Sequence, residues 1–137
     1  MPEERLSEHE VTPEPDARRL VQRWFGIWGE GDINVVDEVC ADPYLRHTSM
    51  GSESISLEQY KRKLVQTRQA LRDAVTTIDD QAVSGDRVWT RATSRGVNFA
   101  TAEPAVVTWI VIHRIERGRI AETWAATLAG TEWKPLG

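Results

Sequence analysis

Apolar residues in the first part of the chain recur at helical spacing. From Asp16 onward they return every three or four positions, which places them on one stripe of a helix that ends near Gly29 and Gly31. Asp32 is a good N-cap for a short second helix over residues 33–40, which Pro43 cannot continue. The stripe of the first helix consists of Leu20, Val21, Trp24, Ile27 and Trp28.

A third helix is indicated by its N-terminal signal. Ser56 and Gln59 have the spacing of a capping box, in which each side chain bonds the backbone of the other. The residues that follow repeat at helical spacing and form the expected buried line: Leu57, Tyr60, Leu64, Thr67 and Leu71. Between the second and third helices, residues 44–47 are expected to be a short extended segment.

After Asp73 the period changes from that of a helix to two. Residues 75–83 and 87–99 are predicted to form antiparallel strands around a turn at residues 84–86. Residues 106–127 are predicted to form a second hairpin with Gly118 in its turn. The sequence therefore predicts a four-stranded meander.

The order of these elements indicates the fold class. Residues 106–115 contain so many β-branched side chains that we expect a central strand covered on both sides. Helices followed by strands indicate an α+β fold, with three helices packed on one face of a curved antiparallel sheet. Such packing can leave a pocket between the first helix and the sheet.

One domain is expected from the length and composition. The chain has 137 residues, of which 40% are hydrophobic and 28% charged, enough for one ordinary core. Residues 1–15 contain three prolines and no apolar period, so we expect a mobile N-terminal arm. The domain is expected over residues 16–128, followed by a C-terminal tail at 129–137 that contains Trp133.

Charge and cysteine content narrow the classes of partner. A net charge of -4 offers no basic field for nucleic acid, and no apolar run is long enough to cross a membrane. The polar N-terminus lacks the pattern of a signal peptide, and the single Cys40 cannot form an internal disulfide. We expect a cytoplasmic protein in which Cys40 is inert packing.

Three phrases, taken in order, resemble one family. They are WGEGD at 28–32, GDRVWTR at 85–91 and HRIERGRIAETW at 113–124. Together they resemble the SnoaL-like branch of the nuclear transport factor 2 superfamily, over residues 16–126. The resemblance implies a cone-shaped α+β barrel with one deep apolar pocket, usually as a homodimer. Polyketide cyclases, ketosteroid isomerases, epoxide hydrolases and non-catalytic binders all share this fold, so the fold does not choose the function.

The resemblance makes His47 the first catalytic candidate. In isomerase-like members the general base is an Asp that lies five residues beyond the position of Asp42, and that position is His47 here. A histidine facing the pocket could remove a proton next to a carbonyl, because its ordinary pKa lies near 6.5. The alternative is a histidine that is hydrogen-bonded at the pocket rim.

Other positions depart from the pattern of the family. The isomerase Tyr that donates to the oxyanion matches Trp24, and the strand acid falls at or near Val111, so ordinary steroid isomerisation ranks low. The Asp that serves the cyclases as acid and base is Ala125 here, and an Asp often found three residues later is Leu128. Either another residue has taken this role or the pocket has another use.

His113 is the substitute that the sequence offers. Strand alternation puts Trp109, Val111 and His113 on one side, which the resemblance places toward the pocket. His47 and His113 could then work as a catalytic pair, although a lone histidine in an apolar strand is more often a satisfied core residue. Two histidines without an inward carboxylate make a poor metal site, so neither a metal nor another cofactor is expected.

Charged residues on the strands have two interpretations. Arg91 could orient a carbonyl or a carboxylate, but a cross-strand network of Arg91, Arg114 and Glu122 is favoured. If Ala125 faces the pocket, Glu122 points away from it, and a slipped register would reverse this. Glu122 is therefore a secondary candidate.

Aromatic side chains suggest the kind of ligand. The chain has six tryptophans, and a pocket lined by indoles suits a flat multi-ring or polyene molecule. The candidate binding residues are Trp24, Trp28, Tyr44, Trp89, Arg91, Trp109, Val111 and Ala125.

Three functions follow in order of preference. The first is a cofactor-independent polyketide cyclase or isomerase of secondary metabolism that acts on a hydrophobic ketone, with His47 as base and His113 assisting. The second is a non-catalytic small-molecule binding protein of the same fold. The third is an epoxide hydrolase, which needs an Asp, Arg, Asp arrangement for which only Arg91 is in a plausible place.

Overall fold

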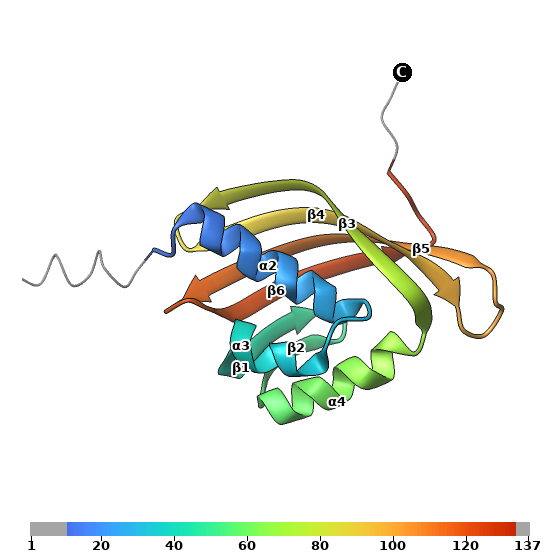
Figure 1. The fold of residues 1–137 in the computed structure, drawn as a ribbon, viewed down its shortest axis with the longest axis horizontal. Helices are drawn as coiled ribbons and strands as arrows, with labels where there is room; N and C mark the ends of the chain where they lie inside the picture. Colours follow the sequence, from blue (N-terminus) through green and yellow to red (C-terminus); the bar gives the residue numbers. More distant parts are fainter. Residues whose placement is uncertain (1–10, 134–137) are drawn as a thin grey trace, which may run out of the picture.

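Three helices cover one face of a curved six-stranded sheet (Figure 1). The computed structural model describes residues 11–133, so most of the predicted arm at 1–15 and the last four residues of the predicted tail lie outside the described residues. Along the chain the elements are α2 (Glu14–Trp28), η1 (Ile33–Val35), α3 (Val36–Val39), β1 (Cys40–Thr48), β2 (Gly51–Ile55), α4 (Leu57–Arg68), β3 (Leu71–Ser84), β4 (Arg87–Asn98), β5 (Pro104–Glu116) and β6 (Arg119–Ala129). The fold is α+β, as predicted.

The helix signals are confirmed, with small shifts at the ends. The Asp32 carboxylate accepts a hydrogen bond from the backbone N–H of Asn34, and Ser56 and Gln59 form the predicted capping box. Helix α2 begins at Glu14, two residues before the predicted start. Helix α4 ends at Arg68, so the last residue of the predicted buried line, Leu71, belongs to β3.

The sheet is larger than the predicted meander. Strands β3 to β6 form the four-stranded meander, but β1 adds to it by pairing in parallel with β6, and β2 pairs with β1. The complete order is β2-β1-β6-β5-β4-β3, with β2 and β3 as free edges, so the sheet is open rather than a closed barrel. The polar sequence of β2, GSESI, has no apolar alternation that could have predicted a strand.

The β5–β6 hairpin fixes which side chains face the helices. Arg117 and Gly118 both have positive φ in its turn, the backbone that a tight hairpin needs. In the register of the hairpin, Val111 lies opposite Ala125 and His113 lies opposite Thr123. These four residues lie on the helix-covered face of the sheet.

The other face of the sheet, which we call the open face, carries Trp89, Arg91, Ile110 and Trp124. Ile110 is 50% exposed, so β5 is not covered on both sides as its β-branched composition had suggested. The core therefore lies between the helices and one face of the sheet. Its largest side chains include Trp24, Phe25, Tyr44, Tyr60, Leu64 and Ile120.

None of the described helices has the length and apolar character that a membrane span requires.

Candidate functional site

A cavity of about 330 Å³ lies between the helices and the sheet. Helices α2 and α4, the β1–β2 turn and strands β3 to β6 all contribute to its wall. Its lining residues are Trp24, Trp28, Arg46, His47, Thr48, Ser49, Met50, Thr67, Arg68, Ala70, Leu71, Ala74, Ser94, Val107, Trp109, Thr123, Ala125 and Thr127. Among the predicted binding residues, it contains Trp24, Trp28, Trp109 and Ala125.

Three indoles form a continuous aromatic wall in this cavity. The ring centroids of Trp24, Trp28 and Trp109 lie 5.7 to 6.1 Å from one another. Each indole N–H donates to a hydroxyl, at 3.1 Å to Tyr44, 3.2 Å to Tyr60 and 2.8 Å to Ser94. Because every N–H is already bonded, the indoles offer the cavity apolar surface rather than hydrogen bonds.

A buried chain of hydroxyls runs from Trp24 to the cavity. The Tyr44 hydroxyl accepts from Trp24 and shares a second hydrogen bond with Thr123, which lines the cavity. Tyr44 is fully buried, and burial raises the pKa of its phenol well above the ordinary value, so the phenol keeps its proton near neutral pH. Since an indole can only donate, the Tyr44 O–H is oriented to donate to the Thr123 hydroxyl oxygen. The Thr123 O–H is then free to donate to a ligand.

His113 lies in the core and not in the cavity wall. Its ring centroid is 4.5 Å from that of Trp24 and 5.9 Å from that of Phe25. The side chain is fully buried, and neither ring nitrogen has a hydrogen-bond partner within residues 11–133. Burial lowers the pKa of His113 to about 3 from its ordinary value of 6.5, so the ring is neutral at physiological pH.

His47 lies at the edge of the cavity, but its ring is held elsewhere. Its Nδ1 is 2.7 Å from the Ser52 hydroxyl, and its Nε2 is 2.7 Å from Glu122 Oε2. The ring also stacks on Trp124, with 5.2 Å between centroids and 10° between planes. Trp124 belongs to the open face, so the imidazole lies on the side of the sheet opposite Thr123. The structure therefore does not bring His47 and His113 together as a pair.

Glu122 holds this arrangement in place. It accepts from His47 and, at 3.0 Å, from the Nε of Arg114. Partial burial alone would raise the pKa of Glu122, but the hydrogen bonds from His47 and Arg114 outweigh it and lower the pKa. The Glu122 carboxylate can only accept, so the His47 Nε2–H donates to it, and in the neutral imidazole Nδ1 accepts from the Ser52 hydroxyl. Ala125 lines the cavity while Glu122 points away, the arrangement expected for an unslipped register.

Two predicted binding residues lie on the open face instead of in the cavity. Trp89 is 48% exposed, and Arg91 is 3.8 Å from Asp79 in an ion pair. Strand alternation explains both positions, because their neighbour Thr90 lies opposite Val111, on the helix-covered face. The epoxide-hydrolase alternative depended on Arg91, which does not reach the cavity.

Val111 and Tyr44 have a supporting position. Both are fully buried on the helix-covered face and neither lines the cavity. Tyr44 is hydrogen-bonded to the cavity-lining Thr123, whereas Val111 packs in the core. Among the cavity-lining residues that sequence reasoning missed, the polar ones used below are Arg46, Arg68, Ser94 and Thr123. No local signal marks them, since each reaches the cavity through the pairing of strands or the end of a helix.

Other chemical features of the molecule do not form a site. Within residues 11–133, no three His, Cys, Asp or Glu side chains gather closely enough to hold a metal ion. Burial raises the pKa of the Cys40 thiol to about 12, which keeps this cysteine unreactive.

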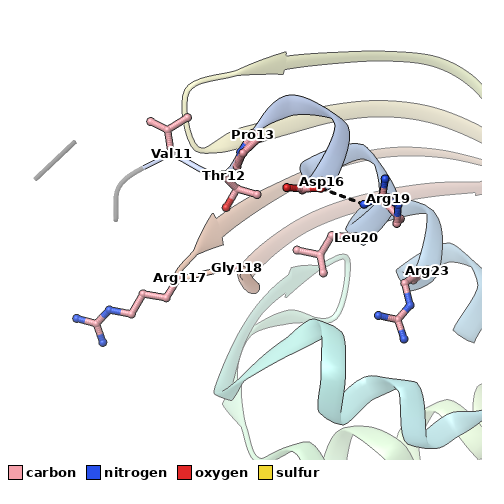
Figure 2. Close-up of a pocket in the computed structure, with 9 residues that line it drawn as sticks. All are labelled: Val11, Thr12, Pro13, Asp16, Arg19, Leu20, Arg23, Arg117 and Gly118. Atoms are coloured by element: carbon pink, nitrogen blue, oxygen red, sulfur yellow. Dashed lines mark hydrogen bonds and ion pairs between the residues drawn. The ribbon is translucent and has the colours of Figure 1, made fainter. Parts of the chain in front are cut away.

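A second hollow lies between the start of α2 and the β5–β6 turn (Figure 2). It is larger, at about 580 Å³, but it opens broadly to solvent. Arg19 and Arg23 are bound to Asp16 and Glu38, and Figure 2 shows Arg117 extending away from α2. The indole-lined cavity, which is more enclosed and has ordered polar groups, is the better candidate site.

Comparison with known proteins gives one family and many similar structures. A family model described as the SnoaL-like domain matches residues 21–123. No curated protein matches the sequence significantly.

The structural neighbours are similar in fold at low identity. TsrD from Streptomyces laurentii is 21% identical, with a TM-score of 0.74 over 85% of this chain and 90% of that chain. IdmH, a proposed polyketide cyclase from Streptomyces antibioticus, is 22% identical, with a TM-score of 0.67 over 83% and 91%. A proposed SnoaL-like polyketide cyclase from Jannaschia sp. CCS1 is 16% identical, with a TM-score of 0.74 over 86% and 90%. At these identities the likeness concerns the fold.

Proposed function

Because the chain belongs to the SnoaL-like domain family, we propose that it is a cofactor-independent cyclase or isomerase of secondary metabolism. Its substrate in this proposal is a hydrophobic multi-ring or polyene ketone that binds in the indole-lined cavity. The family is cyclase- and isomerase-like, and proposed polyketide cyclases share the fold.

The aromatic wall of Trp24, Trp28 and Trp109 carries this proposal. Three adjacent indoles without free N–H groups favour a ligand that is flat and apolar over most of its surface. The hydroxyls that hold these indoles also fix their orientation. A ligand stacked against this wall is held in one orientation, and positioning of this kind can itself lower a reaction barrier.

Thr123 provides the polar contact for the ketone. It is only 3% exposed and lines the cavity, and its hydroxyl is hydrogen-bonded to that of Tyr44. A buried donor aimed at a carbonyl stabilises the negative charge that develops there when a neighbouring proton is removed. In this role Thr123 replaces the donors that the isomerase-like members have at the positions of Trp24 and Val111.

His47 is the proposed base. Among the described cavity-lining residues it is the only histidine, and no Asp, Glu or Lys lines the cavity, so it is the only side chain of a kind that commonly serves as a general base. To reach a ligand, its ring must rotate away from Ser52 and Glu122, which hold it on the opposite side of the strand.

The position of the His47 ring also favours the second candidate, a non-catalytic small-molecule binding protein. If the ring of His47 stays with Ser52 and Glu122, the cavity lining within residues 11–133 contains no base, and Ala125 replaces the usual cyclase acid. Such a protein would bind the same flat ligands and release them unchanged.

A ligand panel tests the two candidates. Wild-type and His47→Ala proteins would be titrated with polycyclic and polyene ketones by tryptophan fluorescence, and each ligand would then be recovered and examined by mass spectrometry and NMR. The enzyme proposal expects conversion by wild type that is lost in His47→Ala while binding persists. Conversion that survives in His47→Ala would remove His47 from the mechanism, and binding without conversion would support the second candidate.

Thr123→Val is expected to lower turnover of a converted ketone by about 10²-fold, with little change in KM. Valine has nearly the shape of threonine but cannot donate a hydrogen bond to the developing oxyanion. Thr127→Val is the matched control, because Thr127 lines the same face of β6 without a contact to Tyr44. Steady-state kinetics measures both variants, and equal losses of turnover in the two would contradict a specific role for Thr123.

A homodimer formed through the open face is also part of the proposal. Trp89, Ile110 and Leu128 are each about half exposed there, and such a patch is typical of a protein interface. The face carries arginines as well as carboxylates, so two copies related by a twofold axis could match opposite charges.

Ile110→Glu is expected to convert this dimer into a monomer, because it buries a charge at the centre of the interface. Val65→Glu is the matched control, since Val65 is similarly exposed but lies on α4, away from the open face. Sedimentation equilibrium measures the mass of each protein. A wild-type mass of one chain, or a dimer that survives Ile110→Glu, would contradict the proposal.

A further inference from the structure

The charged residues in the cavity wall are all cationic. Arg46 and Arg68 line the cavity, and no Asp, Glu or Lys does so among the described residues. This is notable because the chain as a whole has a net charge of -4. The positive charge is therefore local to the cavity and is not a property of the whole surface.

Arg46 is only partly neutralised. Its guanidinium donates to Glu53 at 2.6 Å and lies 5.0 Å from the centre of the Tyr60 ring. Lys63 donates to the same Glu53 carboxylate at 3.0 and 3.2 Å. Two cations thus share one carboxylate, so this group keeps a net positive charge beside the cavity.

Arg68 has no carboxylate partner within 4 Å among residues 11–133. Its Nη1 donates to the backbone carbonyl of Gly31 at 3.0 Å, which orients the guanidinium without neutralising it. Glu30 and Asp73 line a neighbouring hollow together with Arg68, but neither forms an ion pair with it. The remaining N–H groups of Arg68 are free to donate to a ligand.

We propose that the ligand of the cavity carries a carboxylate, which Arg68 binds while the indole wall receives the ring system. A planar guanidinium matches a planar carboxylate through paired hydrogen bonds, and a partly buried site strengthens the attraction. Arg46 adds to the positive field but is held by Glu53. This inference rests on the proposed function, because it names the ligand class of the same cavity as a flat aromatic or polyene acid.

The test compares an acid with its neutral ester. Isothermal titration calorimetry would measure binding of 2-naphthoate and of methyl 2-naphthoate, which share the ring system. Wild type is expected to bind the acid about tenfold or more tightly than the ester, because a charge-assisted hydrogen bond contributes roughly this much. Added salt is expected to weaken binding of the acid and to leave the ester nearly unchanged.

Variants on one helix assign the effect to Arg68. Arg68→Gln is expected to bind acid and ester about equally, and Arg68→Lys to retain part of the preference. Arg62→Gln removes the same charge from an exposed position of α4 that does not line the cavity, so it is expected to behave like wild type. Thermal unfolding and circular dichroism confirm that each variant is folded.

Each outcome bears on one of the two proposals. Equal affinity for acid and ester in wild type overturns the carboxylate inference and leaves the proposed function intact. The same conclusion follows if Arg62→Gln loses the preference for the acid as completely as Arg68→Gln does. Absence of binding by both probes counts against the cavity as a site for flat ligands, and the inference then fails with the proposed function. Ala125→Trp, which fills the cavity, is expected to abolish binding of both probes if they occupy it.

Discussion

Replacing Trp24 with alanine is expected to lower the free energy of unfolding by about 3–5 kcal/mol, the usual effect of removing a large buried aromatic side chain. Trp24 is 2% exposed and packs against Phe25, Trp28, Trp109 and His113. The substitution removes those contacts at once and opens a void that the rigid neighbours fill poorly. It also leaves the buried Tyr44 hydroxyl without its donor.

Urea denaturation followed by far-ultraviolet circular dichroism measures this loss. Trp89→Ala is the matched control, because the same side chain is removed from a position that is 48% exposed on the open face. For this variant we expect a clearly smaller loss, about 1–2 kcal/mol in the monomer, because about half of the side chain is already in water. Similar losses in the two variants would mean that Trp24 is not part of the core as the structure describes it.

Acidification is expected to destabilise the protein through His113 before most carboxylates titrate. The folded protein keeps His113 neutral down to a pKa of about 3, whereas the unfolded chain takes up this proton near pH 6.5. Between these two values the unfolded state binds more protons, so stability is complete above pH 6.5 and falls as the pH is lowered. The slope is about 1.4 kcal/mol per pH unit, which is about 2 kcal/mol from about pH 7.5 to about pH 5.

His113→Leu identifies the source of this slope. Leucine has similar bulk and takes up no proton, so the variant should lack the contribution of His113 over this pH range. Urea unfolding of the two proteins at a series of pH values gives the difference in stability, in which titrations common to both cancel. A constant difference across the range would show that His113 does not resist protonation in the folded state.

Trp24 and His113 also show how the core differs from the cavity. His113 packs against Trp24 in the core, whereas the polar side chains that line the cavity are hydroxyls, two arginines and, at its edge, His47. From the two proposals we therefore expect a ligand to be recognised by stacking, by one buried hydroxyl and by positive charge. A base, if His47 serves as one, has to come from the other side of β1.

Much of the site could not be predicted because it depends on partners far away in the chain. Thr123 is hydrogen-bonded to Tyr44, 79 residues earlier, and the ring of His47 is oriented by Glu122, 75 residues later. The parallel pairing of β1 with β6 creates both contacts, and neither strand carries a local signal for it. The resemblance predicted that His47 faces the pocket, whereas its ring lies on the opposite side of β1, with Ser52 and Glu122.

The sequence by itself determined the local elements of this protein. Asp32, the Ser56–Gln59 capping box and the turns at Gly85 and Gly118 act within a few residues, so the helices and hairpins could be predicted from them. Tertiary structure alone decided which side chains meet in the cavity. In a sheet, neighbouring residues face opposite sides and the register is set by distant strands, so Trp89 and Arg91 lie on the open face while Thr123 and Arg46 line the cavity.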